Sequence, residues 1–213
     1  MFEQFVNGLL WQISVLVFIV GIVMRIFAML RHGRRKDLAE ARGSAFAGAL
    51  WTNISRFKSR PEIAEKIRFQ TISGYMFHLG LFALLLFAAP HIEFAKERIL
   101  GFGWPAMPNW LFIISTQISL LGLLLLLLQR LMNPVTRLIS RPDNYISIGL
   151  LFLVMLTGCW VYFQPDSGLA YIHLFTMELL MLYFPFSNLM HAFLFVSSRA
   201  YTGALFGLRG MKV

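Results

Sequence analysis

Residues 171–195 form the stretch YIHLFTMELLMLYFPFSNLMHAFLF, which is apolar except at a few positions and contains His173 and His191. The two histidines are 18 residues apart, or five turns at 3.6 residues per turn. A continuous helix would place both imidazoles on one face, roughly 27 Å apart along the axis, close to the roughly 30 Å thickness of a hydrocarbon core. We therefore predict a membrane-spanning helix with one histidine near each face of the bilayer and a kink at Pro185.

The rest of the chain has the composition of a membrane protein. Hydrophobic residues make up 58% of its 213 residues, well above the usual share in soluble domains. Because backbone groups in hydrocarbon must bond internally, apolar stretches of about 20 residues should be helices. The predicted fold is all-α, a five-transmembrane-helix bundle that forms a single domain over residues 1–213. Its spans are expected at about 5–30, 69–89, 110–128, 145–163 and 171–195.

Basic residues predict the orientation of this bundle. The loop 31–68 contains ten Lys and Arg, the segment 129–144 three and the tail after Val196 three, whereas the opposite side has only Lys96 and Arg98. By the positive-inside rule, the N-terminus is then outside and the C-terminus cytoplasmic. Topology and anionic lipid account for the net charge of +9, so no nucleic acid partner is needed. The first span has no basic n-region or small-residue cleavage site and is expected to remain uncleaved.

Four of the five histidines fall in or beside the predicted spans, at two depths. His78 lies about ten residues into the second span, and His191 lies at a similar depth in the cytoplasmic half of the fifth. Opposed imidazoles at one level are typical of bis-histidine ligation of a b-type haem between bundle helices. Gly74 and Gly80, on either side of His78, would let a flat macrocycle approach the backbone.

His173 and His91 form a second candidate pair near the outer face. His91 follows His78 by 13 residues, a rotation of roughly 140° on a regular helix, and Pro90 before it should kink or end that helix. The alternative for each histidine is a hydrogen-bonded packing residue.

Other polar features are sparse. Glu178 is the only acid deep within a span, which suits either proton release from a quinol or a carboxyl group satisfied by a neighbouring hydroxyl. Trp104 is expected to anchor the outer loop at the interface, and the lone Cys159 excludes a disulfide or iron–sulfur cluster. The segment Ser59–Phe69 is predicted to be an interfacial helix or a docking surface, and the run LLGLLLLLL at 120–128 is predicted to face lipid.

The segment HLFTMELLMLYFPFSNLMH, residues 173–191, resembles the last helix of the nitrate reductase gamma-subunit family, which are membrane cytochromes b with five helices. Supporting matches are FHLG at 77–80, NPVTRLIS at 133–140 and the pair Thr157–Gly158. Within this family, the chain is most similar to the membrane subunit of the dissimilatory sulfite reductase-linked complex and to heterodisulfide reductase cytochrome b. The resemblance extends from about Phe69 onward.

The resemblance implies that His78 and His191 ligate an inner haem b and that His173 is one ligand of an outer haem. The family places the second outer ligand ten residues after the first; Ala88 stands there, and His91 is the nearby histidine. The family's role is electron exchange between membrane quinone and a cytoplasmic iron–sulfur subunit in the cytoplasmic membrane of a prokaryote. Glu178 and Trp104 are the candidate residues for the quinone and its protons.

The sequence therefore predicts an electron-transfer subunit with one or two haems and with no catalytic residues apart from a quinone site. One alternative is a haem-free membrane anchor or assembly subunit for a cytoplasmic enzyme. Another is a transporter with a proton path through Glu178, which would need more polar residues along the spans.

Overall fold

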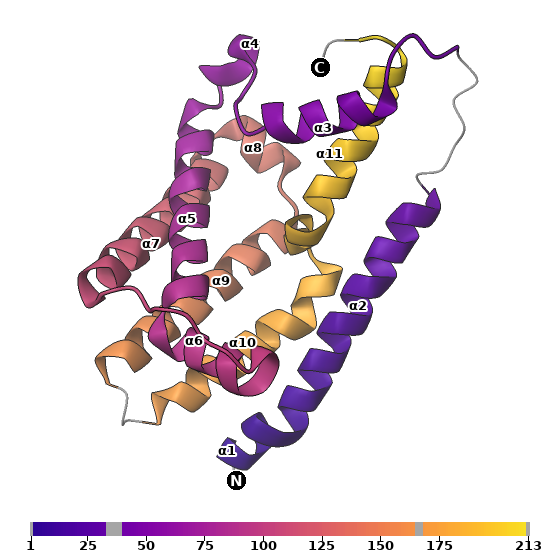
Figure 1. Ribbon diagram of the computed structural model, residues 1–213. Helices are drawn as coiled ribbons and strands as arrows, with labels where there is room; N and C mark the ends of the chain where they lie inside the picture. The colour runs from indigo at the N-terminus through magenta and orange to yellow at the C-terminus, as the bar shows by residue number, and fades with distance from the viewer. Residues whose placement is uncertain (1, 33–39, 165–167, 212–213) are drawn as a thin grey trace. The chain divides into compact units, whose positions relative to one another are not determined.

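The computed structural model describes residues 2–32, 40–164 and 168–211, and every regular element in these ranges is a helix (Figure 1). Two compact units are present, and each is described by itself. Unit 1 consists of Met1–Ala64 and Leu174–Val213, and unit 2 of Glu65–His173.

Five helices in the described ranges are long and apolar enough to cross a membrane. They are Phe2–Arg31, Arg68–Phe87, Asn109–Met132, Pro142–Phe163 and Leu169–Phe186. The predicted number of apolar helices is confirmed, and the first four lie within a few residues of the ranges expected from the sequence. The fifth is shorter than predicted, because it ends at Phe186 instead of Phe195.

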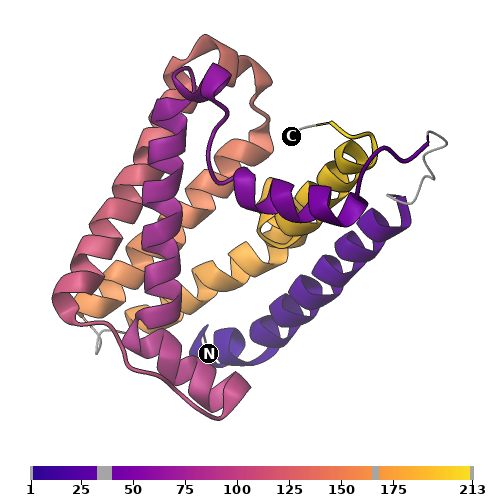
Figure 2. The ribbon, with the colours of Figure 1, turned by 45° about the horizontal axis from the view of Figure 1, so that its top comes forward.

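Unit 2 is built on long antiparallel helices joined by short ones. In chain order its elements are α5 (Arg68–Phe87), α6 (Ala89–Ala95), η2 (Lys96–Leu100), α7 (Asn109–Met132), α8 (Pro134–Ile139), α9 (Pro142–Phe163) and the start of α10 (Leu169–Tyr183). Helices α5 and α7 lie side by side, and α9 packs on α7 (Figures 1 and 2). The buried core of this unit joins Phe77 and Leu84 of α5 to Leu123 of α7 and Met155 of α9.

Small residues bring α5 and α7 into close contact. A Cβ atom on Gly122 would lie 2.5 Å from the backbone nitrogen of Phe77, and one on Gly80 would lie 2.6 Å from the carbonyl oxygen of Ser115. Ser119 adds a hydrogen bond from its hydroxyl to the Phe77 carbonyl, 2.9 Å. Such small-residue contacts are a common source of helix association in membranes.

Two predictions about this region are wrong for the same reason. The run at 120–128 does not simply face lipid, because Gly122 and Leu123 are buried against α5. Gly80 packs against α7, so the space above it is filled by a helix instead of a macrocycle.

Unit 1 contains both ends of the chain. Its elements are α1 (Phe2–Phe5), η1 (Val6–Leu10), α2 (Trp11–His32), α3 (Ala45–Ser55), α4 (Pro61–Ala64), the rest of α10, η3 (Phe184–Phe186), η4 (Asn188–Met190) and α11 (His191–Leu208). The predicted continuous helix over 171–195 is therefore wrong: α10 ends at Tyr183, Ser187 is extended, and α11 begins at His191. The five-turn argument for one shared face fails, because two short 3₁₀ turns separate the histidines.

Contacts with α2 stabilise this break. Pro185 cannot donate a backbone hydrogen bond, and its own carbonyl accepts one from Arg25 Nε, 3.0 Å away. Gly21 lets Pro185 approach, because a Cβ there would collide with the proline ring. The rings of Phe18 and Phe184 pack edge to face at a centroid distance of 5.3 Å. Specific contacts with α2 therefore stabilise this break, which is larger than the kink that a single proline produces.

The segment after the break also differs from the sequence prediction. Instead of ending near Phe195, the chain continues as α11 to Leu208, and α3 packs against it (Figures 1 and 2). Gly48 of α3 faces the backbone of Gly203 and Gly207 with no room for a Cβ. The interfacial helix predicted at Ser59–Phe69 is only the single turn α4, a bend and the start of α5.

We expect Gly122→Ala to destabilise the protein by about 1–3 kcal/mol, because the added methyl group overpacks a contact with backbone atoms of α5. Thermal unfolding in detergent, followed by circular dichroism, measures the change. Gly149→Ala is the matched control, since a Cβ there meets nothing within 4 Å and gains helix propensity instead. Equal melting temperatures for the two variants would contradict the tight α5–α7 contact.

Candidate functional site

The structure places the four candidate histidines beside helix ends or in close helix contacts. His78 is in α5, His91 in α6 and His173 in α10, all within unit 2 and half-buried. His191 is the first residue of α11 in unit 1 and is exposed.

The structure brings His91 and His173 together. Their ring centroids are 6.4 Å apart and their planes differ by 22°. An imidazole nitrogen lies about 2.0–2.1 Å from a bound metal and about 1.1 Å from the centre of its own ring, so two rings on opposite sides of one ion have centroids roughly 6.3 Å apart. The spacing of the predicted outer pair therefore fits two axial ligands of a single iron.

A break between α5 and α6 positions His91. The first helix ends at Phe87, Ala88 is extended at φ −70° and ψ 130°, and α6 begins with Pro90 in its first turn, where proline is well tolerated. His91 Nδ1 lies 3.0 Å from the Leu84 carbonyl, which belongs to the last turn of α5. This bond turns the ring of His91 back toward α5. Because the helix breaks at Ala88, the angle of about 140° between His78 and His91 that a regular helix would give does not apply.

The ring of His173 packs against Thr157 and Gly158 of helix α9. Thr157 Oγ1 lies 3.1 Å from His173 Nδ1, and also 2.9 Å from the Leu153 carbonyl and 3.0 Å from that of Val154. A Cβ on Gly158 would lie 3.0 Å from Cε1 of the imidazole, so glycine leaves the space that the ring fills. The small pair Thr157–Gly158, expected to allow close helix approach, thus admits a side chain.

Hydrogen bonds to carbonyl oxygens place a proton on Nδ1 of three of these histidines. His78 Nδ1 lies 2.7 Å from the Gly74 carbonyl, and His191 Nδ1 lies 2.7 Å from that of Asn188. Carbonyl oxygens only accept, so Nδ1 carries the proton in these two residues and in His91. His173 Nδ1 pairs with the Thr157 hydroxyl, a group that can donate or accept. A hydrogen bond at Nδ1 that orients the ring is common among metal-binding histidines.

A histidine pair provides the two axial ligands that a haem needs, since a haem itself brings four in-plane nitrogens. In residues 2–32, 40–164 and 168–211, no group of three or more His, Cys, Asp or Glu side chains comes together.

His78 and His191 are in separate units, and their pairing across one iron stays a prediction. The side of α5 at Gly74 is open, since a Cβ there meets nothing within 4 Å, which leaves room for a flat group beside His78.

Glu178 is the most deeply buried acid among the described residues. Its side chain is fully buried, and neither carboxyl oxygen has a hydrogen-bond partner in the described part of the chain. The predicted alternative is a carboxyl group that bonds to a neighbouring hydroxyl, and no such bond is present among the described residues. A buried carboxyl group without a partner costs free energy and is typical of a functional position.

Trp104 has a structural partner. Its indole Nε1 donates a hydrogen bond to the Leu86 carbonyl, 2.6 Å away, and the Met107 backbone nitrogen donates to the Phe87 carbonyl. These bonds cap the C-terminal end of α5, where carbonyls have no helical partner. The only donor of the Trp104 ring is therefore engaged in holding the break that positions His91.

Comparison with known proteins gives one distant relative and no family. No family model matches the chain. A protein of Nitratidesulfovibrio vulgaris, described only as "Protein", is 26% identical over 143 residues, which is 66% of this chain and 63% of the relative. The chain thus aligns with less than two thirds of that relative's length, and the relative's description assigns no activity.

We expect Thr157→Val to lower the free energy of unfolding by about 1–3 kcal/mol, because it removes the hydroxyl that pairs with His173 Nδ1 while preserving the side-chain shape. Thr157→Ser, which keeps the hydroxyl, is the matched control. Nitrogen-15 NMR of histidine-labelled protein should show the same His173 Nδ1 signal in the wild type and in Thr157→Ser and a shifted one in Thr157→Val. An unchanged His173 signal in Thr157→Val would refute the assigned bond.

Proposed function

We propose that this protein is a haem b membrane subunit that exchanges electrons between membrane quinone and a cytoplasmic iron–sulfur protein. One haem is ligated by His91 and His173, and the sequence predicts a second with His78 and His191 as its ligands. The observation that supports this most directly is the 6.4 Å separation of the His91 and His173 rings, together with the Nδ1 hydrogen bonds that orient both rings.

The chain's own residues hold and orient the group. Hydrogen bonds with the Leu84 carbonyl and the Thr157 hydroxyl orient the two outer imidazoles, and Gly158 leaves space for the ring of His173. Bound haem supplies one-electron redox chemistry, and the apolar helices around it control solvent access and thereby the reduction potential.

The proposed orientation follows the distribution of basic residues. With the N-terminus outside, the ten Lys and Arg of residues 31–68 and the basic tail lie on the cytoplasmic side. They form the surface for the iron–sulfur partner and place the His78–His191 haem toward it. The His91–His173 haem is then nearer to the outer face, where quinol is oxidised or quinone reduced.

Glu178 provides the proton step in this proposal. Oxidation of a quinol to a quinone releases two protons with two electrons, and the buried carboxylate of Glu178 accepts one of these protons. Its lack of a partner among the described residues leaves it available for such an exchange.

A haem-free membrane anchor remains the second candidate. The five apolar spans and the folded α3–α11 pair would suit it, because together they offer a lipid-embedded body and a basic surface for a partner. The histidine geometry favours the haem protein, since the rings of His91 and His173 lie 6.4 Å apart and each is oriented by an Nδ1 hydrogen bond.

The purified chain should contain two b-type haems, visible as α-bands in reduced-minus-oxidised spectra. Each of His91→Ala and His173→Ala should lose the same single haem, because they supply opposite ligands of one iron. His32→Ala is the control and should retain both. A colourless but folded preparation would falsify the proposal and favour the anchor, and unchanged haem content in His91→Ala would remove the outer pair.

Glu178→Gln should keep both haems and slow haem reduction by a water-soluble quinol roughly 100-fold or more, because the amide cannot accept the proton. Stopped-flow absorption measures the rate. Glu97→Gln, at an exposed carboxylate, is the control. Equal rates for the wild type and Glu178→Gln would show that Glu178 has no part in quinol oxidation.

A further inference from the structure

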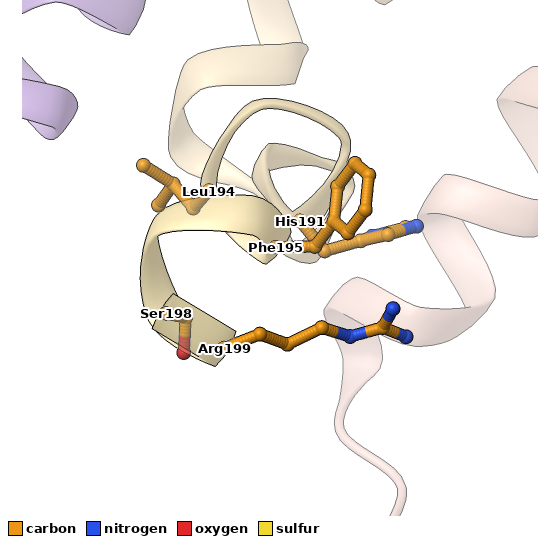
Figure 3. Close-up of a pocket in the computed structure, with 5 residues that line it drawn as sticks. All are labelled: His191, Leu194, Phe195, Ser198 and Arg199. Carbon is orange, nitrogen blue, oxygen red and sulfur yellow. The ribbon is translucent and has the colours of Figure 1, made fainter. Parts of the chain in front are cut away.

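A pocket of about 330 Å³ opens along α11, two turns of which line it (Figure 3). Its walls are His191, Leu194, Phe195, Ser198 and Arg199. In Figure 3 the imidazole of His191 and the guanidinium of Arg199 extend in the same direction, whereas Leu194 and Ser198 point elsewhere.

Arg199 has an unsatisfied hydrogen-bonding group in this pocket. Its Nη1 atom is buried and has no hydrogen-bond partner among the described residues. The rings of Phe57 and Phe195 lie 5.2 and 5.4 Å from its Cζ atom. Aromatic rings contact the face of a guanidinium and leave its N–H donors, which lie in the plane, for an acceptor.

The acceptor that best satisfies such a donor is an anionic oxygen group. A buried guanidinium donor left unpaired costs free energy, and a carboxylate or phosphate can take two of its N–H groups at once. Among the residues that line the pocket, none is acidic. An anionic ligand would supply the counter-charge that these five residues lack.

The position of the pocket indicates which ligand brings that charge. His191 and Arg199 are eight residues apart on α11, roughly 12 Å along the helix axis. Under the proposed function His191 binds the haem iron, and a haem is a broad plate whose propionates put anionic groups at its edge, within reach of a second residue on the same helix.

We propose that Arg199 binds an anionic oxygen group in this pocket, and that this group is a propionate carboxylate of the haem ligated by His191. The assignment to a propionate rests on the proposed function. A phospholipid phosphate offers the same chemistry and is the other source of such a group. Arg199 is a positioning residue: it fixes the rotation of the haem about the bond from iron to His191, and its positive charge favours the reduced iron.

The test uses the full chain with His91→Ala, so that only the inner site is loaded. Apoprotein in detergent is titrated with haem b and with its dimethyl ester, whose propionates are uncharged. We expect haem b to bind roughly 10- to 100-fold more tightly than the ester, the factor that a charge-assisted hydrogen bond provides. Arg199→Gln should abolish this preference and lower the reduction potential, Arg199→Lys should retain part of it, and Arg209→Gln is the control on the same helix end.

The outcomes separate this inference from the proposed function. Equal affinity for haem b and its ester in the wild type, with normal haem spectra, overturns the propionate assignment and leaves the haem protein standing. Loss of bound phospholipid in Arg199→Gln, measured by native mass spectrometry, with haem binding unchanged, assigns the site to a lipid phosphate. A chain that takes up no haem at all overturns the proposed function and the propionate assignment together.

Discussion

The structure depends on one constraint: in a medium without water, each backbone group that leaves a helix needs another partner. Two helix breaks, at Ala88 and at residues 184–190, expose such groups, and side chains from distant segments satisfy them. Arg25 donates to the Pro185 carbonyl, and Trp104 donates to the Leu86 carbonyl. Because these partners are specific, each break has a defined geometry, and the side chains beyond it are held in place.

Two of the histidines lie beside these breaks. His91 and His191 follow them, and each donates from Nδ1 to a carbonyl of the preceding helical segment. These carbonyls already accept from the backbone N–H groups of Ala88 and His191, so the imidazole bonds add to the backbone pairing and orient the rings. Under the proposed function, the helix breaks are thus part of the ligand sphere, because weakening a break would release the imidazole that completes it.

Apolar length and composition were enough to predict the five spans, since these depend on the thickness of the bilayer alone. The spacing of His173 and His191 gave a wrong prediction of a shared helix face, because the 3.6-residue period holds only in a continuous helix. Pro185 indicates that the helix is disturbed, but the residue alone does not tell how far the disturbance extends. The decisive contacts, Arg25 with Pro185 and Gly21 beneath it, join residues 160 or more apart, which no local pattern reveals. The four candidate histidines of the site could be identified from the sequence. Thr157 could not be identified as the partner of His173, because the sequence shows it only as a member of the small-residue pair Thr157–Gly158 in an apolar span.

Under the proposed function, the break at Ala88 gives a reason why His91, and not residue 88, pairs with His173. A ligand at position 88 would need a continuous α5, but here that residue is 3% exposed, extended and followed by a new helix. His91 is the third residue of α6, and its Nδ1 reaches back to the Leu84 carbonyl, one turn before Ala88. The ring centroid of His91 lies 6.4 Å from that of His173. In the haem proposal, a histidine at 88 would thus suit an unbroken helix, and one at 91 suits a broken one.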